Sequence, residues 1–262
     1  MKKRLSIIIL IGLFALTAPF LLILQGQSTE KIASPTPISK PSQQTLDEIK
    51  KNFPSVEYAA ERVLDETRRN RSIKYDRYRV LYPEIVEDGR EVSFADWLPN
   101  ASPLPIEESD IVVLGKVTAA AAYLSANKNS VYSEFEINIE KVFKNSRNEE
   151  FEERSLRVER EGGVVIFPTG YKTWYYVSGQ RMPRMGSRYL FLLTHQFPIY
   201  GYREKELFLL AGYEFRDGRV NPLDMPDAGS HPVATFYTGK EESVLLADVK
   251  DALKNSKKAL PE

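Results

Sequence analysis

The chain has 262 residues, and its 36 Lys and Arg residues balance its 36 Asp and Glu residues, so the net charge implies no charged partner. An apolar content of 42%, with 11% aromatic residues, is enough for a packed core and argues against a disordered chain. The absence of cysteine excludes disulfides, thiol catalysis and thiolate metal sites, and two histidines are too few for an imidazole-rich metal site. No cofactor is therefore predicted.

The N-terminus combines a basic start with a long apolar run. Lys2-Lys3-Arg4 precedes an uncharged stretch from Leu5 to Leu24, which as a helix would be about 30 Å long, the thickness of a bilayer's hydrocarbon core. Residues 1–27 are therefore predicted to be an uncleaved signal-anchor, with a cleaved signal peptide as the alternative. The basic flank would stay inside, which predicts a single-pass cell-membrane protein whose C-terminal domain lies outside the cytoplasm. After cleavage the protein would instead be secreted or periplasmic.

Two segments separate this run from the main domain. Residues 28–44 are rich in Pro, Ser and Thr, and they predict an extended, solvated tether. Residues 45–109 are predicted to be a helical and irregular arm. In this arm, Ser55 caps an amphipathic helix of about four turns that ends near Arg69.

The end of this predicted helix is basic and interleaved with tyrosine. The residues concerned are Arg68, Arg69, Arg71, Lys74, Arg77 and Arg79, with Tyr75 and Tyr78. Such a segment could contact anionic lipid, but the favoured interpretation is a solvated helix end whose tyrosines pack on the main domain. Export makes nucleic acid an unsuitable partner, so none is predicted.

Residues 110–237 are predicted to form the main domain. Residues 111–114 are a bounded aliphatic run, and Phe135, Ile137 and Ile139 alternate with polar residues, as expected of a half-buried strand. Val142 breaks this alternation, which predicts a bulge near residues 140–141. Further strands are expected at 164–167, 171–177, 189–193 and 207–211, and Asp217-Gly218 predicts a hairpin.

This density of short strands predicts a mainly β fold, a small OB-like antiparallel barrel or sandwich. Residues 238–262 are predicted to be a C-terminal amphipathic helix and tail, opened by a capping box that begins at Thr238. The barrel would therefore be flanked by an N-terminal and a C-terminal amphipathic helix, after an N-terminal transmembrane helix or signal.

Catalytic motifs are missing from the sequence. It contains no nucleophile elbow, P-loop, dinucleotide fingerprint or paired-histidine helix. A Ser-His-Asp triad would have to use His195 or His231, and both are more simply interpreted as surface histidines. A pair of carboxylates of glycosidase type stays open, because such pairs assemble in space rather than in sequence.

Two local clusters are suited to recognition. One is the aromatic strand with Trp174 and Tyr176, whose outward face could stack on sugar rings or anchor a protein, unless both faces are covered. The other is the loop of residues 178–186, where Gln180, Arg181 and Arg184 could grip a carboxylate or phosphate, unless the loop is only a solubilising hairpin. Both guanidinium groups are expected to face solvent.

Four stretches carry a family resemblance: SDIVVLGKV (109–117), YSEFEINIEKVFKN (132–145), VSGQRMPRMGSRYLFLL (177–193) and LLAGYEFRDGRVNPLD (209–224). Together they resemble a group of uncharacterised exported bacterial proteins, and more distantly the OB-like barrel of netrin-type and tissue-inhibitor-type domains. The distant resemblance implies a strand pattern only. Those domains rely on disulfides and, in tissue inhibitors, on an N-terminal cysteine, so no functional residue transfers to this chain.

The sequence predicts a non-enzymatic, extracytoplasmic binding or interaction module for an unidentified ligand or protein, tethered at the membrane. The alternatives are a hydrolase of cell-envelope polymer that uses carboxylates at the barrel mouth, and a structural envelope protein. A dense cleft around a perturbed carboxylate would favour the enzyme. A shallow mouth lined by Arg181, Arg184 and aromatic residues would favour binding.

Overall fold

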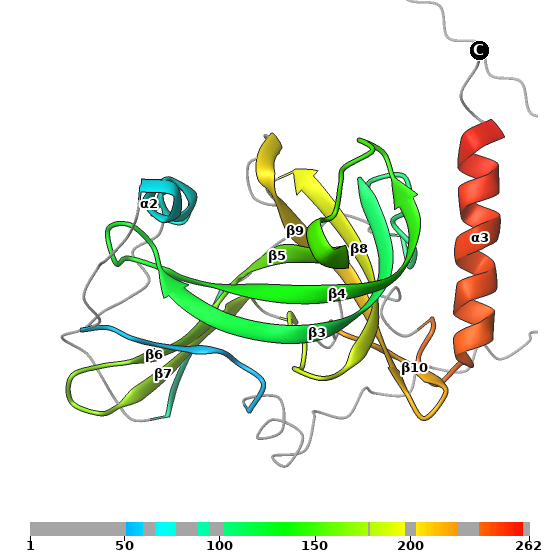
Figure 1. The fold of residues 1–262 in the computed structure, drawn as a ribbon. Helices are drawn as coiled ribbons and strands as arrows, with labels where there is room; N and C mark the ends of the chain where they lie inside the picture. Colours follow the sequence, from blue (N-terminus) through cyan, green and yellow to red (C-terminus); the bar gives the residue numbers. More distant parts are fainter. Residues whose placement is uncertain are drawn as a thin grey trace, which may run out of the picture. The chain divides into compact units, whose positions relative to one another are not determined.

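A computed structural model describes residues 51–59, 66–76, 89–94, 102–177, 179–196, 203–224 and 236–258 (Figure 1). The predicted signal-anchor, the tether and the start of the arm lie outside these residues. Within the described ranges, no helix is both long enough and apolar enough to span a bilayer.

The described elements are mainly strands, as predicted, and they form two sheets. In chain order they are β1 (Ser55–Glu57), α2 (Glu66–Ile73), β2 (Arg90–Phe94), β3 (Ile111–Leu124), β4 (Val131–Asn145), η1 (Glu152–Arg154), β5 (Ser155–Glu161), β6 (Gly163–Ile166), β7 (Lys172–Val177), β8 (Arg188–Gln196), β9 (Arg203–Arg216), β10 (Arg219–Pro222) and α3 (Glu242–Lys258).

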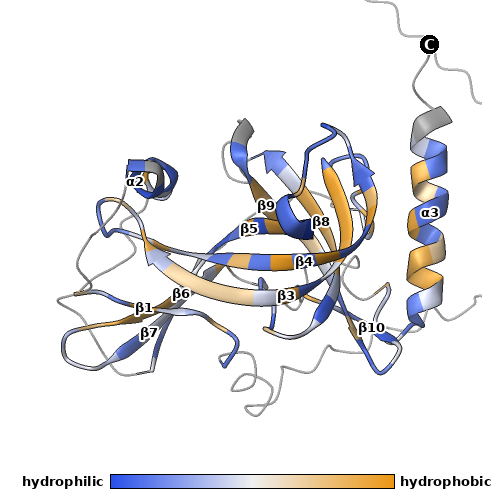
Figure 2. Cartoon of the chain, viewed as in Figure 1, coloured by the Kyte–Doolittle hydropathy of each residue, from blue (hydrophilic) through white to orange (hydrophobic). Residues whose placement is uncertain are grey.

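The larger sheet has the strand order β10-β9-β5-β4-β3-β8, and an additional pairing joins β9 to β8 (Figure 1). Its neighbours are antiparallel except for β5 and β9, which run parallel. The main core lies on one face of these strands and includes Phe135, Ile137 and Phe191, all fully buried. The period-two pattern of β4 is visible in Figure 2 as alternating hydrophobic and hydrophilic residues, and it follows from the alternation of side chains along a strand.

The β3–β4 hairpin contains the predicted bulge. Leu114 pairs with Lys141 and Gly115 pairs with Ile139, which leaves Glu140 as the extra residue. A bulge here is expected to return Val142 to the buried face, and this expectation is wrong, because Val142 is 41% exposed. A second register shift follows at once, between Val112 and Val113, and this re-aims the end of the strand.

The smaller sheet has the order β1-β6-β7-β2 and contains two parallel pairs, β1–β6 and β2–β7. The predicted helix from Ser55 is wrong, because residues 55–57 are a strand. Within the described part of residues 45–109, the helix covers only residues 66–73. Val56 pairs with Val165, and the Val164 amide donates to the Pro54 carbonyl at 2.8 Å. Pairing with a distant strand therefore overrides the local helical spacing. The prediction of a purely antiparallel fold is also wrong, because β1–β6 and β2–β7 run parallel.

The C-terminal helix and the hairpin before it agree with the sequence. Asp217 and Gly218 have φ values of 52° and 70°, as a two-residue turn of type I′ requires. Leu245 and Val249 of α3 are fully buried against the outer face of β8 and β9. The helix begins four residues after Thr238, because residues 239–242 pair with the hairpin. The Gly239 amide donates to the Val220 carbonyl, and the Lys240 carbonyl accepts the Val220 amide.

Candidate functional site

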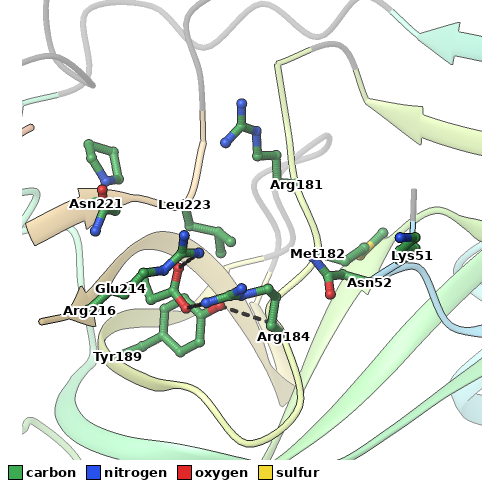
Figure 3. A pocket seen from close by; sticks show the side chains of 11 residues that line it. Lys51, Asn52, Arg181, Met182, Arg184, Tyr189, Glu214, Arg216, Asn221 and Leu223 are labelled. Carbon is green, nitrogen blue, oxygen red and sulfur yellow. Dashed lines mark hydrogen bonds and ion pairs between the residues drawn. The ribbon is translucent and has the colours of Figure 1, made fainter. Parts of the chain in front are cut away.

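The predicted arginine loop borders a cavity of about 500 Å³ (Figure 3). Its apolar wall is formed by Met182, Tyr189 and Leu223, which also belong to the main core. Its polar wall carries four cationic side chains and one carboxylate: Lys51, Arg181, Arg184, Arg216 and Glu214. The cavity therefore combines an apolar side with an excess of positive charge.

The loop is held in place at both ends. Gly179 and Gly186 both have a φ of 77°, a left-handed conformation that glycine adopts without strain. The Gly186 amide donates to the carbonyl of Val117 on β3 at 2.8 Å, and the Ser187 carbonyl accepts the Val117 amide at 3.1 Å. Met182 is 3% exposed and anchors the middle of the loop in the core. These contacts fix the backbone from which both arginines project.

Arg184 belongs to a three-residue ionic cluster at the cavity wall. Its guanidinium hydrogen-bonds Glu214 Oε1, while Arg216 donates to Glu214 Oε2 at 3.1 Å (Figure 3). Burial disfavours the charge on Arg184, but its hydrogen bond and ion pair with Glu214 outweigh burial and raise its pKa. The Arg184 side chain is 35% exposed, so it faces solvent only in part, and its guanidinium is paired with Glu214. The Tyr189 hydroxyl accepts the Arg184 amide at 2.9 Å and fixes the cluster further.

Arg181 stands apart from this cluster in Figure 3. Its backbone amide donates to Asp224 Oδ1 at 3.1 Å, but in the described part of the chain no carboxylate forms an ion pair with its guanidinium. Burial lowers the pKa of Arg181, and the charge of Asp224 offsets this only in part. A half-buried guanidinium thus stands at the cavity wall, and among the described residues only the charge of Asp224 offsets its burial.

Arg160 was missed by the sequence analysis. It lies on β5, its side chain is 3% exposed, and Nη2 pairs with Asp224 Oδ1. Its Nε and Nη1 are buried without a hydrogen-bond partner among the described residues. The sequence could have indicated this position, because Arg160 follows Leu156 and Val158 at every second residue. Alternate residues of a strand share a face, and this face points into the core.

Trp174, Tyr176 and Gln180 do not line the cavity. Trp174 and Tyr176 pack against the main core, and the Tyr176 hydroxyl donates to Glu91 at 3.0 Å. Tyr175, on the other face of β7, is 3% exposed. Both faces of the aromatic strand are thus covered, which favours the packing interpretation. The structure brings Arg181 and Arg184 together at one cavity, joined by Lys51, Glu214 and Arg216, which no local pattern marks.

A second polar cluster lies where residues 68–75 cover the outer face of β4 and β5. Arg68 and Arg71 both contact Glu134 at 3.3 Å, and the Tyr75 ring stacks on Tyr132 at 4.2 Å between centroids. Tyr75 thus packs on the main domain as expected, but the expected solvated helix end is wrong for Lys74, whose side chain is 5% exposed. Tyr78, Arg77 and Arg79 lie outside the described residues.

Glu159 is the most perturbed carboxylate of this second cluster. Burial raises its pKa to about 7, although Lys74 and Tyr75, each 2.8 Å away, act in the opposite direction. Its side chain is only 1% exposed, so a substrate cannot reach it while residues 68–75 are in place. A perturbed carboxylate is present, but without the access that catalysis needs.

His195 is buried, at 2% exposure, so its interpretation as a surface histidine is wrong. Nε2 lies 2.6 Å from Glu149 Oε1, and Nδ1 lies 3.2 Å from the carbonyl of Glu206. Both ring nitrogens are therefore engaged inside the protein, and neither is available as a catalytic base. His231 lies outside the described residues. In the ranges that the structure covers, no group of three His, Asp or Glu side chains could hold a metal ion.

The chain matches no protein-family model, no curated protein and no solved structure. Its resemblance to exported bacterial barrel proteins therefore stays a prediction.

Proposed function

We propose that the protein is a non-enzymatic binding module for an anionic ligand, which it takes up in the cavity beside the arginine loop. One observation carries this proposal. The described lining contains four cationic side chains and a single carboxylate, and no carboxylate of the described residues forms an ion pair with the Arg181 guanidinium. A volume of about 500 Å³ lies in the range of small-molecule sites.

We further propose that the larger sheet is an OB-like barrel. Its strands β9-β5-β4-β3-β8 form a run whose ends are joined by the β8–β9 pairing. Five strands closed in this way, with one parallel pair, are consistent with such a barrel. The cavity would then lie at its mouth, where loops on a rigid scaffold often bind ligands.

The location we propose is outside the cytoplasm, at the cell membrane. It rests on the basic flank and the apolar run from Leu5 to Leu24, followed by the proline-rich tether. A binding module held in this way would sample ligands near the membrane surface. Secretion after signal cleavage is the alternative, and N-terminal sequencing of the protein from its native host distinguishes the two.

The two alternative functions have less support. A hydrolase of glycosidase type needs two carboxylates that reach its substrate, whereas Glu214 is held by two arginines and Glu159 is buried. A structural protein that touches lipid through its basic segment would need free cations there. Of the described cations of this segment, Arg71 and Lys74 instead contact Glu134, Glu159 and Glu206, and Arg69 is exposed.

The test is an anion-binding screen of the full-length protein in detergent micelles, with calorimetry as the readout. We expect Arg181→Ala to lose anion binding and to keep its melting temperature. The matched control is Arg157→Ala, which removes an equally charged side chain that is 52% exposed and lies outside the cavity lining. Identical binding profiles for wild type and Arg181→Ala would remove the cavity as the site.

A further inference from the structure

We propose that the anion taken by the cavity is a phosphate monoester attached to an apolar body. This inference rests on the proposed function and narrows it to one ligand class. It follows from the charge of the lining, from the placement of Arg160 behind it, and from the apolar side of the cavity.

The charge of the lining exceeds what a single carboxylate can neutralise. The four cations Lys51, Arg181, Arg184 and Arg216 face one carboxylate, Glu214, which leaves a net charge of +3. A carboxylate ligand would cancel only one of these charges. A phosphate monoester carries about −1.5 to −2 at neutral pH and has three acceptor oxygens. A doubly charged group therefore matches the lining better.

Two of the cations are available to meet that group. The Glu214 carboxylate already holds Arg184 and Arg216, one on each oxygen. Arg181 has no such partner in the described chain, and its planar guanidinium can donate two parallel hydrogen bonds to one phosphate. Lys51 adds a compact charge at the same cavity. Arg181 is thus the side chain that would hold the phosphate.

Arg160 is a buried cation that lies behind this position and is paired with Asp224. Asp224 Oδ1 accepts both from the Arg181 amide and from Arg160, so Asp224 links the cavity wall to the buried guanidinium. Arg160 is 3% exposed, and two of its nitrogens have no hydrogen-bond partner among the described residues. Asp224 balances the charge of Arg160, so the pair adds unsatisfied donors rather than net charge behind the wall.

The apolar residues of the lining predict the rest of the ligand. Met182, Tyr189 and Leu223 line it, and all three are core residues with 5% exposure or less. Apart from the Tyr189 hydroxyl, which already accepts the Arg184 amide, these side chains offer carbon surface, so an inorganic ion would leave that surface in contact with water. A phosphate ester with an aromatic or aliphatic body would cover it and gain hydrophobic contact.

The test compares three probes on the full-length protein in detergent micelles by calorimetry. Phenyl phosphate has both the dianion and the apolar body. Methyl phenyl phosphate keeps the body but has one charge, and inorganic phosphate has the charge without the body. We expect phenyl phosphate to bind at least tenfold more tightly than either of the others. We also expect Arg181→Ala to lose at least tenfold for phenyl phosphate, with Arg157→Ala unchanged.

The outcomes separate this inference from the proposed function. If methyl phenyl phosphate binds as tightly as phenyl phosphate, the doubly charged group is wrong. If inorganic phosphate binds as tightly as phenyl phosphate, the inference that the ligand has an apolar body is wrong. In both cases an effect of Arg181→Ala would leave the anion-binding module standing. If none of the three probes binds, the inference is overturned, and the anion screen alone decides the proposed function. If Arg181→Ala changes binding in neither experiment, both are overturned.

Discussion

The hydroxyl of Tyr75 donates a hydrogen bond to the buried carboxylate of Glu159, with 2.8 Å between the oxygens. Lys74 approaches the same carboxylate oxygen at 2.8 Å and Glu206 at 3.0 Å. Residues that directly follow α2 are thus fixed to two strands, β5 and β9, that are far away in the sequence. A contact made of charges is sensitive to their protonation, so this one should respond to pH.

The first prediction concerns that response. Burial raises the pKa of Glu159 from an ordinary value of 4.5 to about 7, so between these values the folded protein holds a proton that the unfolded chain has lost. The contribution of Glu159 to stability is therefore complete below pH 4.5 and is lost as the pH rises through 7. Thermal unfolding at pH 5, 6, 7 and 8 should show the wild type losing stability relative to Glu159→Gln as the pH rises.

A matched control for this experiment is Glu136→Gln, because Glu136 is exposed on neighbouring β4. Its difference from the wild type should stay constant over the same pH range. A constant difference for Glu159→Gln as well would mean that Glu159 is ionised in the folded protein throughout, contrary to its burial.

The second prediction tests the alternation of β4. Ile137 is fully buried in the main core and its neighbour Glu136 points to solvent. Ile137→Ala should cost about 2–5 kcal/mol of unfolding free energy, through lost burial and the cavity left behind. Glu136→Ala should change it by less than about 0.5 kcal/mol. Urea unfolding measures both, and similar midpoints for the two variants would contradict the assignment of the faces.

These two residues also illustrate what can be predicted from the sequence. The faces of β4, the bulge at Glu140 and the Asp217-Gly218 turn follow from periods and turn chemistry within a few residues. The strand at Val56 does not, because its partner Val165 is about a hundred residues away. Its local spacing suits a helix equally well, and only the distant strand decides between them.

The residues of the candidate site could likewise be predicted from the sequence only in part. Arg181 and Arg184 could be found from sequence, because a glycine- and proline-shaped loop marks them. Their partners could not, since Glu214 comes from β9 and Lys51 from the chain before β1. Only the folded structure shows which arginine is neutralised. Glu214 forms an ion pair with Arg184 and not with Arg181.

The third prediction concerns a close approach of β3 and β4. A Cβ added at Gly115 would lie 2.6 Å from Ile137 Cγ2 and 2.7 Å from the carbonyl oxygen of Asn138. The backbone oxygen cannot move without disturbing the ladder, so Gly115→Ala should cost about 1–3 kcal/mol. Gly212→Ala is the control, because its nearest neighbours are side-chain atoms of Leu223 at 3.1 and 3.3 Å. Chemical denaturation should show the larger loss for Gly115→Ala, and equal losses would contradict the model of a backbone clash.

The last prediction uses the asymmetry of the Arg160–Asp224 pair. Arg160 is 3% exposed, whereas Asp224 is 32% exposed and can be solvated when it is alone. Removing the carboxylate leaves a buried cation without its counter-ion, while replacing the cation by an apolar side chain leaves only a partly solvated carboxylate. Asp224→Asn should therefore destabilise the protein more than Arg160→Met does.

Asp224→Asn should also bind phenyl phosphate more tightly, because it removes a negative charge beside Arg181 while an amide oxygen can still accept the Arg181 amide. Melting curves and calorimetry on the two variants measure both effects, and a loss of affinity in Asp224→Asn would show that Asp224 supports the site through more than its charge.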